Sequence, residues 1–197
     1  MMIREGEGGA QTVLEGLTFE DKTDLADAIR ALGSSKLRCR QNSITWMGKV
    51  TPIAEIFRKQ EFYNEFLARV GASKERARKI IPVLKEPDEC LVDFPRKKIF
   101  IIEKKTQRVP GSADEKIAAC DYNKRIYLNL LKGLGGELSS YKLEYVYLLS
   151  GWFEQDKYSY LLKYIKSVGC HYFFYEKNLD KIIRFMFPDI DPDTDKL

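Results

Sequence analysis

Two β-rich runs separated by a short basic connection constrain the fold of this chain most strongly. The first run is ECLVDF at 89–94, the connection is PRKK at 95–98, and the second run is IFIIEKKTQ at 99–107. Branched and aromatic residues on both sides of a tight polar turn are typical of an antiparallel β-hairpin. The chain is therefore expected to build a sheet that contains this hairpin.

The length of the turn decides which hairpin residues face one another. If Arg96 and Lys97 form a two-residue turn, Asp88 lies opposite Lys105. Side chains alternate between the two faces of a strand, and opposite residues share a face. Four polar side chains then project from one side of the hairpin: Asp88, Glu103, Lys105 and Gln107.

A second hairpin geometry stays open at this point. A three-residue turn would move Asp88 to the opposite face, because a one-residue change of register exchanges the faces of a strand. Asp93, which otherwise points away from Glu103, would then be the nearest alternative acid, unless a β-bulge intervened.

The rest of the chain alternates between helical and extended patterns. Apolar spacing predicts helices over 19–32, 52–70, 73–82, 113–131, 157–168 and 179–187. The runs LEYVYLL at 143–149 and HYFFY at 171–175 predict strands, and 34–50 predicts a loop with one short strand. This order predicts an α/β (or α+β) fold with a central mixed sheet flanked by helices and with extra N-terminal helices.

The length of 197 residues and a hydrophobic content of 44% favour one domain over 1–197. Four parts are expected within it: a flexible, Gly-rich N-terminus over 1–12, a helical part over 13–86, a core over 87–188 that carries the chemistry, and an acidic tail over 189–197. The formal net charge is +4, but the tail alone holds four aspartates and one lysine. The remaining body, at +7, is moderately suited to a polyanionic partner.

The composition excludes several classes of function. His171 is the only histidine, so a multi-histidine metal site is excluded and a Ser/His/Asp site is disfavoured. The four cysteines form no CxxC pair, and the chain has no phosphate-binding glycine loop that would hold a nucleotide cofactor. No apolar run is long enough to span a bilayer and no signal peptide is recognisable, so a cytoplasmic protein without a membrane partner is expected.

Carboxylates and lysines must therefore supply any catalysis. Two carboxylates on one face of a hairpin make a hard oxygen site, which suits Mg²⁺. Lys105 beside such an ion could orient an attacking water and stabilise negative charge on a phosphate. An exposed ion pair between Asp88 and Lys105 across the strands explains the same spacing equally well.

The segment PDECLVDFPRKKIFIIEKKTQ, followed by GSADEKI, resembles the core of PD-(D/E)XK nucleases. The run IIEKKTQRVPGSADEKI is particularly similar to type II restriction endonucleases, and the resemblance covers residues 87–150. It implies a restriction-endonuclease-like core that hydrolyses phosphodiesters to leave 5′-phosphates. It also implies that Asp88 and Glu103 bind Mg²⁺, with Lys104, directly after Glu103, as a further position of the metal site, and that Lys105 is the catalytic lysine.

Three further residues are candidates for this site. Such nucleases often carry an acid on a helix before the sheet, and Glu20 could be that acid, although an acid that stabilises a helix N-terminus is the simpler reading. Gln107 could hold a water or a phosphate. Glu115 could approach the metal, but a capping box with Ser112 accounts for it better.

Basic and amide side chains are available for DNA. The candidates are Arg38, Arg40, Gln41, Asn42, Lys49, Arg76, Arg78, Lys79, Lys104 and Arg108. These side chains are explained about as well as ordinary charged residues on solvent-exposed helices and loops. The sequence thus predicts a Mg²⁺-dependent, sequence-specific endonuclease that cuts double-stranded DNA as a homodimer. The alternatives are a structure-specific nuclease of DNA repair or recombination, a nuclease-derived DNA-binding protein without activity, and a helical interaction module.

Overall fold

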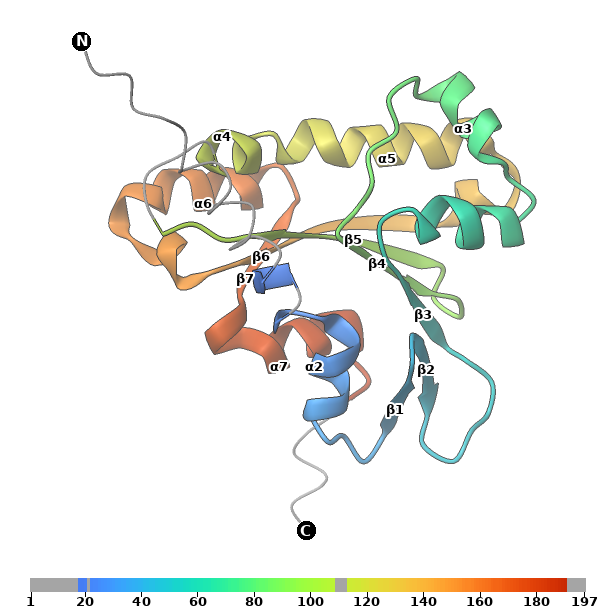
Figure 1. Ribbon diagram of the computed structural model, residues 1–197, viewed down its shortest axis with the longest axis horizontal. Coiled ribbons are helices and arrows are strands. Elements are labelled where there is room, and N and C mark those ends of the chain that lie inside the picture. The colour runs from blue at the N-terminus through green and yellow to red at the C-terminus, as the bar shows by residue number, and fades with distance from the viewer. Residues whose placement is uncertain (1–17, 21, 109–112, 191–197) are drawn as a thin grey trace.

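The computed structural model describes residues 18–20, 22–108 and 113–190, which form a seven-stranded sheet between two layers of helices (Figure 1). The strands are β1 (Leu37–Arg40), β2 (Ser43–Trp46), β3 (Ala54–Phe57), β4 (Glu89–Asp93), β5 (Lys98–Lys105), β6 (Lys142–Leu149) and β7 (His171–Phe174), and they follow chain order across the sheet. Neighbours from β1 to β5 are antiparallel, whereas β5, β6 and β7 run parallel. The predicted α/β fold with a mixed sheet is confirmed.

Helices cover both faces of the sheet. One layer holds η1 (Phe62–Leu67), α3 (Lys74–Ile80), α4 (Ala113–Ala118), α5 (Cys120–Leu134) and α6 (Ser159–Ser167). The other holds α2 (Leu25–Ala31) and α7 (Tyr175–Met186), and short 3₁₀ turns lie at η2 (Gly136–Ser140), η3 (Gly151–Glu154) and η4 (Asp156–Tyr158). Each layer packs on its own apolar cluster, so the sheet separates two cores.

The central strands are buried on both sides because the sheet is covered on both faces. The face toward α5, here called the α5 face, takes Cys90, Val92, Ile99 and Ile101. The opposite face, here called the α2/α7 face, takes Leu91, Phe100 and Ile102. This alternation assigns Asp88, Glu103 and Lys105 to the α5 face and sends Glu89 and Lys104 to the other.

The hairpin forms as predicted, but with a longer turn. Asp93 pairs with Lys98 and Glu89 pairs with Ile102, so residues 94–97 form a four-residue connection. The predicted two-residue turn at Arg96 and Lys97 is therefore wrong. Because the register differs by two residues, an even number, every side chain keeps the face that the alternation predicted.

Residues 52–70 do not form the predicted single helix. Residues 54–57 form β3, which pairs with β4, and a helical segment starts only after Lys59, whose φ is +47°. The apolar spacing of Ile53, Ile56 and Phe57 fits a helix that continues to the later apolar residues. The edge of β4, however, carries backbone N–H and C=O groups that need hydrogen-bond partners, and a helix would leave them unpaired. Pairing across the sheet decides the structure here.

Two other N-terminal expectations also change. The segment 34–50 holds two strands, β1 and β2, rather than one. The predicted helix over 19–32 is interrupted at Asp24, whose carboxylate accepts a hydrogen bond from Asp27 N at 2.9 Å and caps α2. The part before the core is thus a mixture of helices and strands and not helical throughout.

The C-terminal half follows the predicted order of elements. β6, α6, β7 and α7 lie where their patterns placed them, and the helix predicted over 113–131 is present as α4 and α5 with a break at Ala119. The capping residue Ser112, the segment 1–12 and the tail from 191 lie outside the described residues. None of the helices in the described part is both long and apolar enough to cross a bilayer.

Ser73 is the predicted start of α3, and its hydroxyl accepts a hydrogen bond from Arg76 N at 3.1 Å. Replacing this cap by alanine removes the acceptor and leaves the amide to water. Ser73→Ala is therefore expected to lower the free energy of unfolding by about 1 kcal/mol in urea titrations. Ser73→Asp keeps an acceptor and should match the parent protein; equal stability of all three proteins would contradict the cap assignment.

Candidate active site

Asp88, Glu103 and Lys105 meet on the α5 face, at the end of the hairpin remote from its turn. Lys105 Nζ lies 3.2 Å from Asp88 Oδ2 and 3.0 Å from Glu103 Oε2. The same ammonium donates to the carbonyl oxygen of Lys104 at 2.9 Å. The structure thus brings together the two acids and the lysine that the strand alternation predicted.

This arrangement is more than an exposed ion pair across two strands. The side chains of Asp88 and Glu103 are each 16% exposed and that of Lys105 is 21% exposed. One ammonium is shared between two carboxylates, so a second negative group remains without a cation of its own. Mostly buried, unequal charge of this kind is costly for a fold unless another cation approaches.

The backbone fixes the position of the first acid. Asp88 directly precedes β4 and therefore has no partner in the sheet. The neighbouring strand β5 is longer than β4, because it pairs with β6 as far as Lys105. Asp88 Oδ2 accepts a hydrogen bond from Lys104 N at 2.7 Å and thereby takes the place of a neighbouring strand. The backbone amide of Lys59 donates a hydrogen bond to the carbonyl oxygen of Pro87, the residue before Asp88, at 3.0 Å. The carboxylate is consequently held in one orientation.

A pocket of about 500 Å³ opens over Glu103 and Lys105, and Asp88 is not among its lining residues. It is lined by Lys85, Glu103, Lys105, Glu115, Lys116, Ala119, Asn123 and Tyr147. Lys85 Nζ donates to Asn123 Oδ1 at 2.5 Å, and the carbonyl of Lys85 accepts from the hydroxyls of Tyr63 and Tyr127. Lys85 is therefore a second positioned cation at the pocket.

The charged groups of the site shift one another's pKa values. Burial raises the pKa of the Glu103 carboxyl to about 7; the ammonium of Lys105 opposes this rise, and the charge of Asp88 adds to it. Burial lowers the pKa of Lys105, but the two carboxylates outweigh that effect and leave this pKa above its ordinary value. Lys105 is thus a cation at neutral pH, and Glu103 stands close to its titration point.

A second charged cluster lies on the α2/α7 face. Lys104 Nζ lies 3.0 Å from Glu89 Oε2, and both side chains are almost fully buried. Arg58 adds a contact of 3.6 Å to Glu89 and pairs with Asp24. Burial raises the pKa of Glu89, against the opposing charge of Lys104. The side chain of Lys104 is 3% exposed, so the predicted contact of this ammonium with DNA is wrong.

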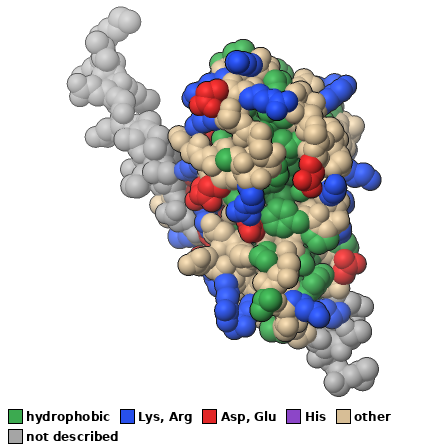
Figure 2. Space-filling model, turned by 90° about the vertical axis from the view of Figure 1, so that its right-hand side faces the viewer, with side chains coloured by type: hydrophobic (Ala, Val, Ile, Leu, Met, Phe, Trp, Pro, Cys, Tyr) green, Lys and Arg blue, Asp and Glu red, His purple; other side chains and the backbone are tan. Residues whose placement is uncertain are grey.

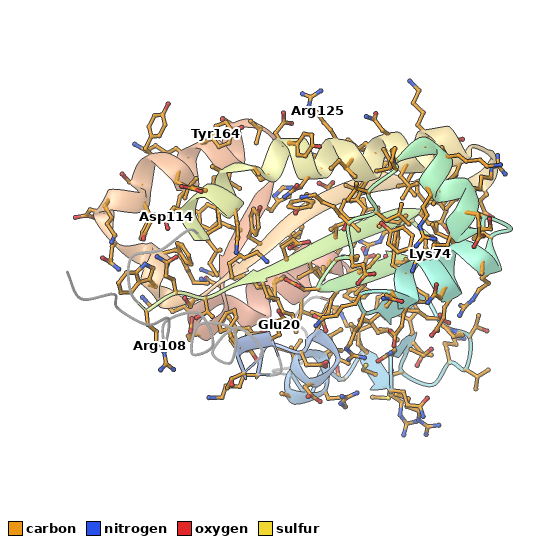
Figure 3. All side chains as sticks on the ribbon, turned by 45° about the horizontal axis from the view of Figure 1, so that its top comes forward. Glu20, Lys74, Arg108, Asp114, Arg125 and Tyr164 are labelled. Atoms are coloured by element: carbon orange, nitrogen blue, oxygen red, sulfur yellow. The ribbon has the colours of Figure 1, made fainter. Side chains whose placement is uncertain are left out.

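Glu20 belongs to this second cluster. Its carboxylate lies 3.1 Å from Lys59 Nζ, and its carbonyl accepts from Lys104 Nζ at 3.0 Å. Figure 3 shows Glu20 and Asp114 on opposite sides of the strands. Glu20 and Asp88 both line a pocket of about 230 Å³, but Glu103 and Lys105 are not among its lining residues. The structure therefore brings Glu20 near one of the two predicted metal ligands only.

Gln107 and Arg108 lie beyond the end of β5, in a third pocket of about 620 Å³. Gln107 is not among the residues that line the pocket of Glu103 and Lys105. The predicted place of Gln107 on the active face assumed that the strand continues, but β5 ends at Lys105. Glu115, by contrast, lines the pocket of Glu103.

The predicted DNA contacts fall into separate groups. Arg38, Arg40, Gln41 and Lys49 are exposed on and beside β1–β2, at the edge of the sheet, while Arg76, Arg78 and Lys79 are exposed on α3 in the α5 layer. Asn42 instead accepts a hydrogen bond from Arg58 at 2.8 Å. Figure 2 shows Lys and Arg side chains dispersed over one side of the molecule, with acidic side chains between them and an apolar strip in the middle. Among the residues that the structure describes, the basic side chains on that side form no single continuous patch.

The donor atoms of the site suit a hard cation. Carboxylate oxygens of Asp88 and Glu103 and the carbonyl oxygen of Lys104 surround one ammonium, and no thiol or imidazole contributes. His171 is engaged elsewhere, at 3.1 Å from Glu144. Within the described ranges no three His, Cys, Asp or Glu side chains are grouped for a metal ion. Mg²⁺ commonly takes only one or two carboxylates and completes its shell with water and substrate phosphate, so two acids are compatible with it.

The sequence reasoning missed Lys85, Asn123 and the Glu89–Lys104 pair. Lys85 stands three residues before Asp88, where no strand pattern places it, and Asn123 comes from a helix that the sequence alone could not dock on the sheet. Glu89 and Lys104 were detectable, because each is the strand neighbour of a predicted site residue and alternation sends it to the other face.

Comparison with known proteins assigns no family to this chain: no protein-family model, no curated protein and no solved structure matches it.

Proposed function

We propose that this chain is a Mg²⁺-dependent DNA endonuclease of the PD-(D/E)XK type. The observation that carries the proposal is the convergence of Asp88, Glu103 and Lys105, with Lys105 Nζ at 3.2 and 3.0 Å from the two carboxylates. The elements around it also support a restriction-endonuclease-like core: an antiparallel hairpin, a crossover through α4 and α5, and a parallel strand β6 that extends the sheet.

Asp88 and Glu103 would hold the ion, with the carbonyl of Lys104 beside them. Bound there, Mg²⁺ would neutralise a phosphate oxygen and lower the pKa of a coordinated water. Lys105, as a cation, can donate to the water or to a phosphate oxygen and stabilise the negative charge on the phosphate oxygens in the transition state. As a ligand of the ion, Glu103 would be held in its carboxylate form, because a nearby cation favours the charged form of a carboxyl group.

The pocket above the site fits a sugar-phosphate backbone. Lys85, Lys105 and Lys116 line it beside Glu103 and Glu115, so its lysines outnumber its acids by one. A lysine ammonium binds phosphate as a point charge. Such contacts position a DNA strand but do not depend on its base sequence. Sequence specificity, cutting of both strands and a homodimer are finer parts of the proposal. Cutting of both strands of a palindromic site follows most simply from two such sites related by two-fold symmetry.

The decisive experiment is incubation of the purified protein with a large defined DNA in Mg²⁺ and in EDTA. Discrete fragments with 5′-phosphate ends in Mg²⁺ and intact DNA in EDTA are expected. End sequencing would then read the cut position directly. Cutting of four-way junctions or flaps but never of plasmid would favour the repair nuclease, and intact DNA of every kind in Mg²⁺ and Mn²⁺ would contradict a nuclease.

A further inference from the structure

The pocket beyond the end of β5 has no role in the chemistry described above. Its walls come from Thr106, Gln107 and Arg108 after β5 and from Ser150, Gly151 and Trp152 after β6. β5 and β6 are parallel, so the pocket lies at the carboxyl ends of two neighbouring parallel strands. Ligands of open α/β sheets commonly bind at this end of the strands.

Three polar atoms in this pocket are buried and lack a partner. Gln107 Nε2, Gln107 Oε1 and Ser150 Oγ form no hydrogen bond within the described part of the chain. Ser150 is only 8% exposed. An unsatisfied buried polar group is rare in native folds, because it loses its hydrogen bonds to water and gains none. The residues around the pocket therefore include an amide donor, an amide acceptor and a hydroxyl whose hydrogen-bonding capacity is unused.

The combination of a donor and an acceptor discriminates between ligands. A phosphate only accepts hydrogen bonds, so it would leave Gln107 Oε1 unsatisfied. The major-groove edge of adenine carries the acceptor N7 beside the donor N6, which pairs with both ends of a glutamine amide. The charges of the lining agree, since Lys22 and Arg108 are accompanied by Glu176, and mixed charge suits a neutral ring better than a bare phosphate.

Aromatic side chains complete the pocket. Phe19 and Trp152 both line it. Trp152 is fixed in place, because its Nε1 donates to Tyr158 Oη at 2.8 Å and Lys157 covers its ring at 4.8 Å. Flat apolar walls of this kind bind bases that have left their stack.

The backbone connects this pocket to the proposed reaction site, although the two pockets share no lining residue. Ser150 N donates to the carbonyl of Lys105 at 3.0 Å, and Gln107 follows Lys105 by two residues. Two residues of extended chain span roughly 6.6 Å, a distance comparable to one nucleotide of an extended strand. We propose that this pocket binds a nucleobase, best matched by adenine, of the nucleotide next to the phosphodiester that is cut. The inference rests on the proposed nuclease function and requires a base that is flipped out or single-stranded.

The test measures binding without cleavage. In ¹⁵N-labelled full-length protein without divalent metal, the side-chain amide of Gln107, assigned by its loss in Gln107→Leu, and the indole N–H of Trp152 are followed by NMR during titration. The probes are deoxyadenosine 5′-phosphate, deoxyribose 5-phosphate and a six-residue oligodeoxyadenylate. Both signals are expected to move with the two adenine probes and not with the sugar phosphate, and the oligonucleotide should bind more tightly than the mononucleotide.

Variants separate a direct contact from an effect on folding. Gln107→Leu and Ser150→Ala should each weaken binding at least about fivefold, read at Trp152, which corresponds to the loss of one hydrogen bond. Gln60→Leu removes an exposed glutamine that does not line the pocket and should bind as the parent protein does. Equal binding by all three variants would overturn the inference, as would shifts of equal size with the sugar phosphate.

The outcomes also separate this inference from the nuclease proposal. Cutting of DNA in Mg²⁺ without any shift of the Gln107 amide would overturn the base pocket alone. Shifts with adenine probes, in a protein that cuts no DNA, would support the pocket and overturn the nuclease. Tighter binding of the mononucleotide than of the oligonucleotide would overturn the assignment to a DNA strand and indicate a free-nucleotide site.

Discussion

Lys105→Ala is expected to slow DNA cleavage at least about 100-fold, the usual cost of removing one positioned charge-stabilising donor. The reason is geometric: Lys105 Nζ is the group that contacts both Asp88 and Glu103. The measurement is the rate at which supercoiled plasmid becomes linear in Mg²⁺. Glu103→Ala, which removes half of the carboxylate pair, should lose activity to a similar extent.

Two controls make this result specific to catalysis. Lys98→Ala removes a lysine from the other end of the same strand and should cut at the parent rate. Circular dichroism and DNA affinity, measured in Ca²⁺ to limit cleavage, should change little in Lys105→Ala and Glu103→Ala. Near-parental cleavage by either folded variant would contradict the assignment of the site.

Lys104→Met is expected to lower the free energy of unfolding by about 3 kcal/mol, the lower end of the range for removing one partner of a buried ion pair. Lys104 and Glu89 are 3% and 1% exposed, so water cannot replace the lost ammonium. Glu89 would keep only the backbone amide of Leu25 at 3.2 Å and a more distant Arg58. Urea unfolding followed by tryptophan fluorescence measures the loss.

The double variant Glu89→Leu/Lys104→Met tests whether charge or packing causes the loss. Removing both charges relieves the unpaired carboxylate, so the double variant should recover much of the stability that Lys104→Met loses. A loss below 1 kcal/mol in the single variant, or an additive loss in the double variant, would show that the pair is not coupled in the way described.

The hairpin and the face of the site could be predicted because both depend on local rules. Strand alternation places Asp88, Glu103 and Lys105 together for any even-numbered change of register. The turn proved two residues longer than the tightest hairpin, with Lys97 at positive φ and Asp93 accepting a hydrogen bond from Arg96 N at 2.9 Å. Because the register differs from the predicted one by an even number of residues, the predicted faces of these side chains are still correct.

The missed features depend on contacts between distant parts of the chain. β3 has apolar residues that fit a helix or a strand, and only its pairing with β4 decides between them. Gln107 left the active face because β5 stops where its neighbour β6 stops, as the last pair, Lys105 and Leu149, shows. Lys85 reaches the site because two tyrosine hydroxyls, from η1 and α5, hold its carbonyl. None of these partners is adjacent in sequence.

The buried pair of Glu89 and Lys104 has a consequence for the register of this hairpin. If β5 slipped by one residue against β4, Glu103, Lys104 and Lys105 would exchange faces, and Glu89 would remain unpaired in the apolar layer. A two-residue slip would restore the alternation. The ion pair of Glu89 and Lys104 therefore opposes any slip of β5 against β4 by an odd number of residues.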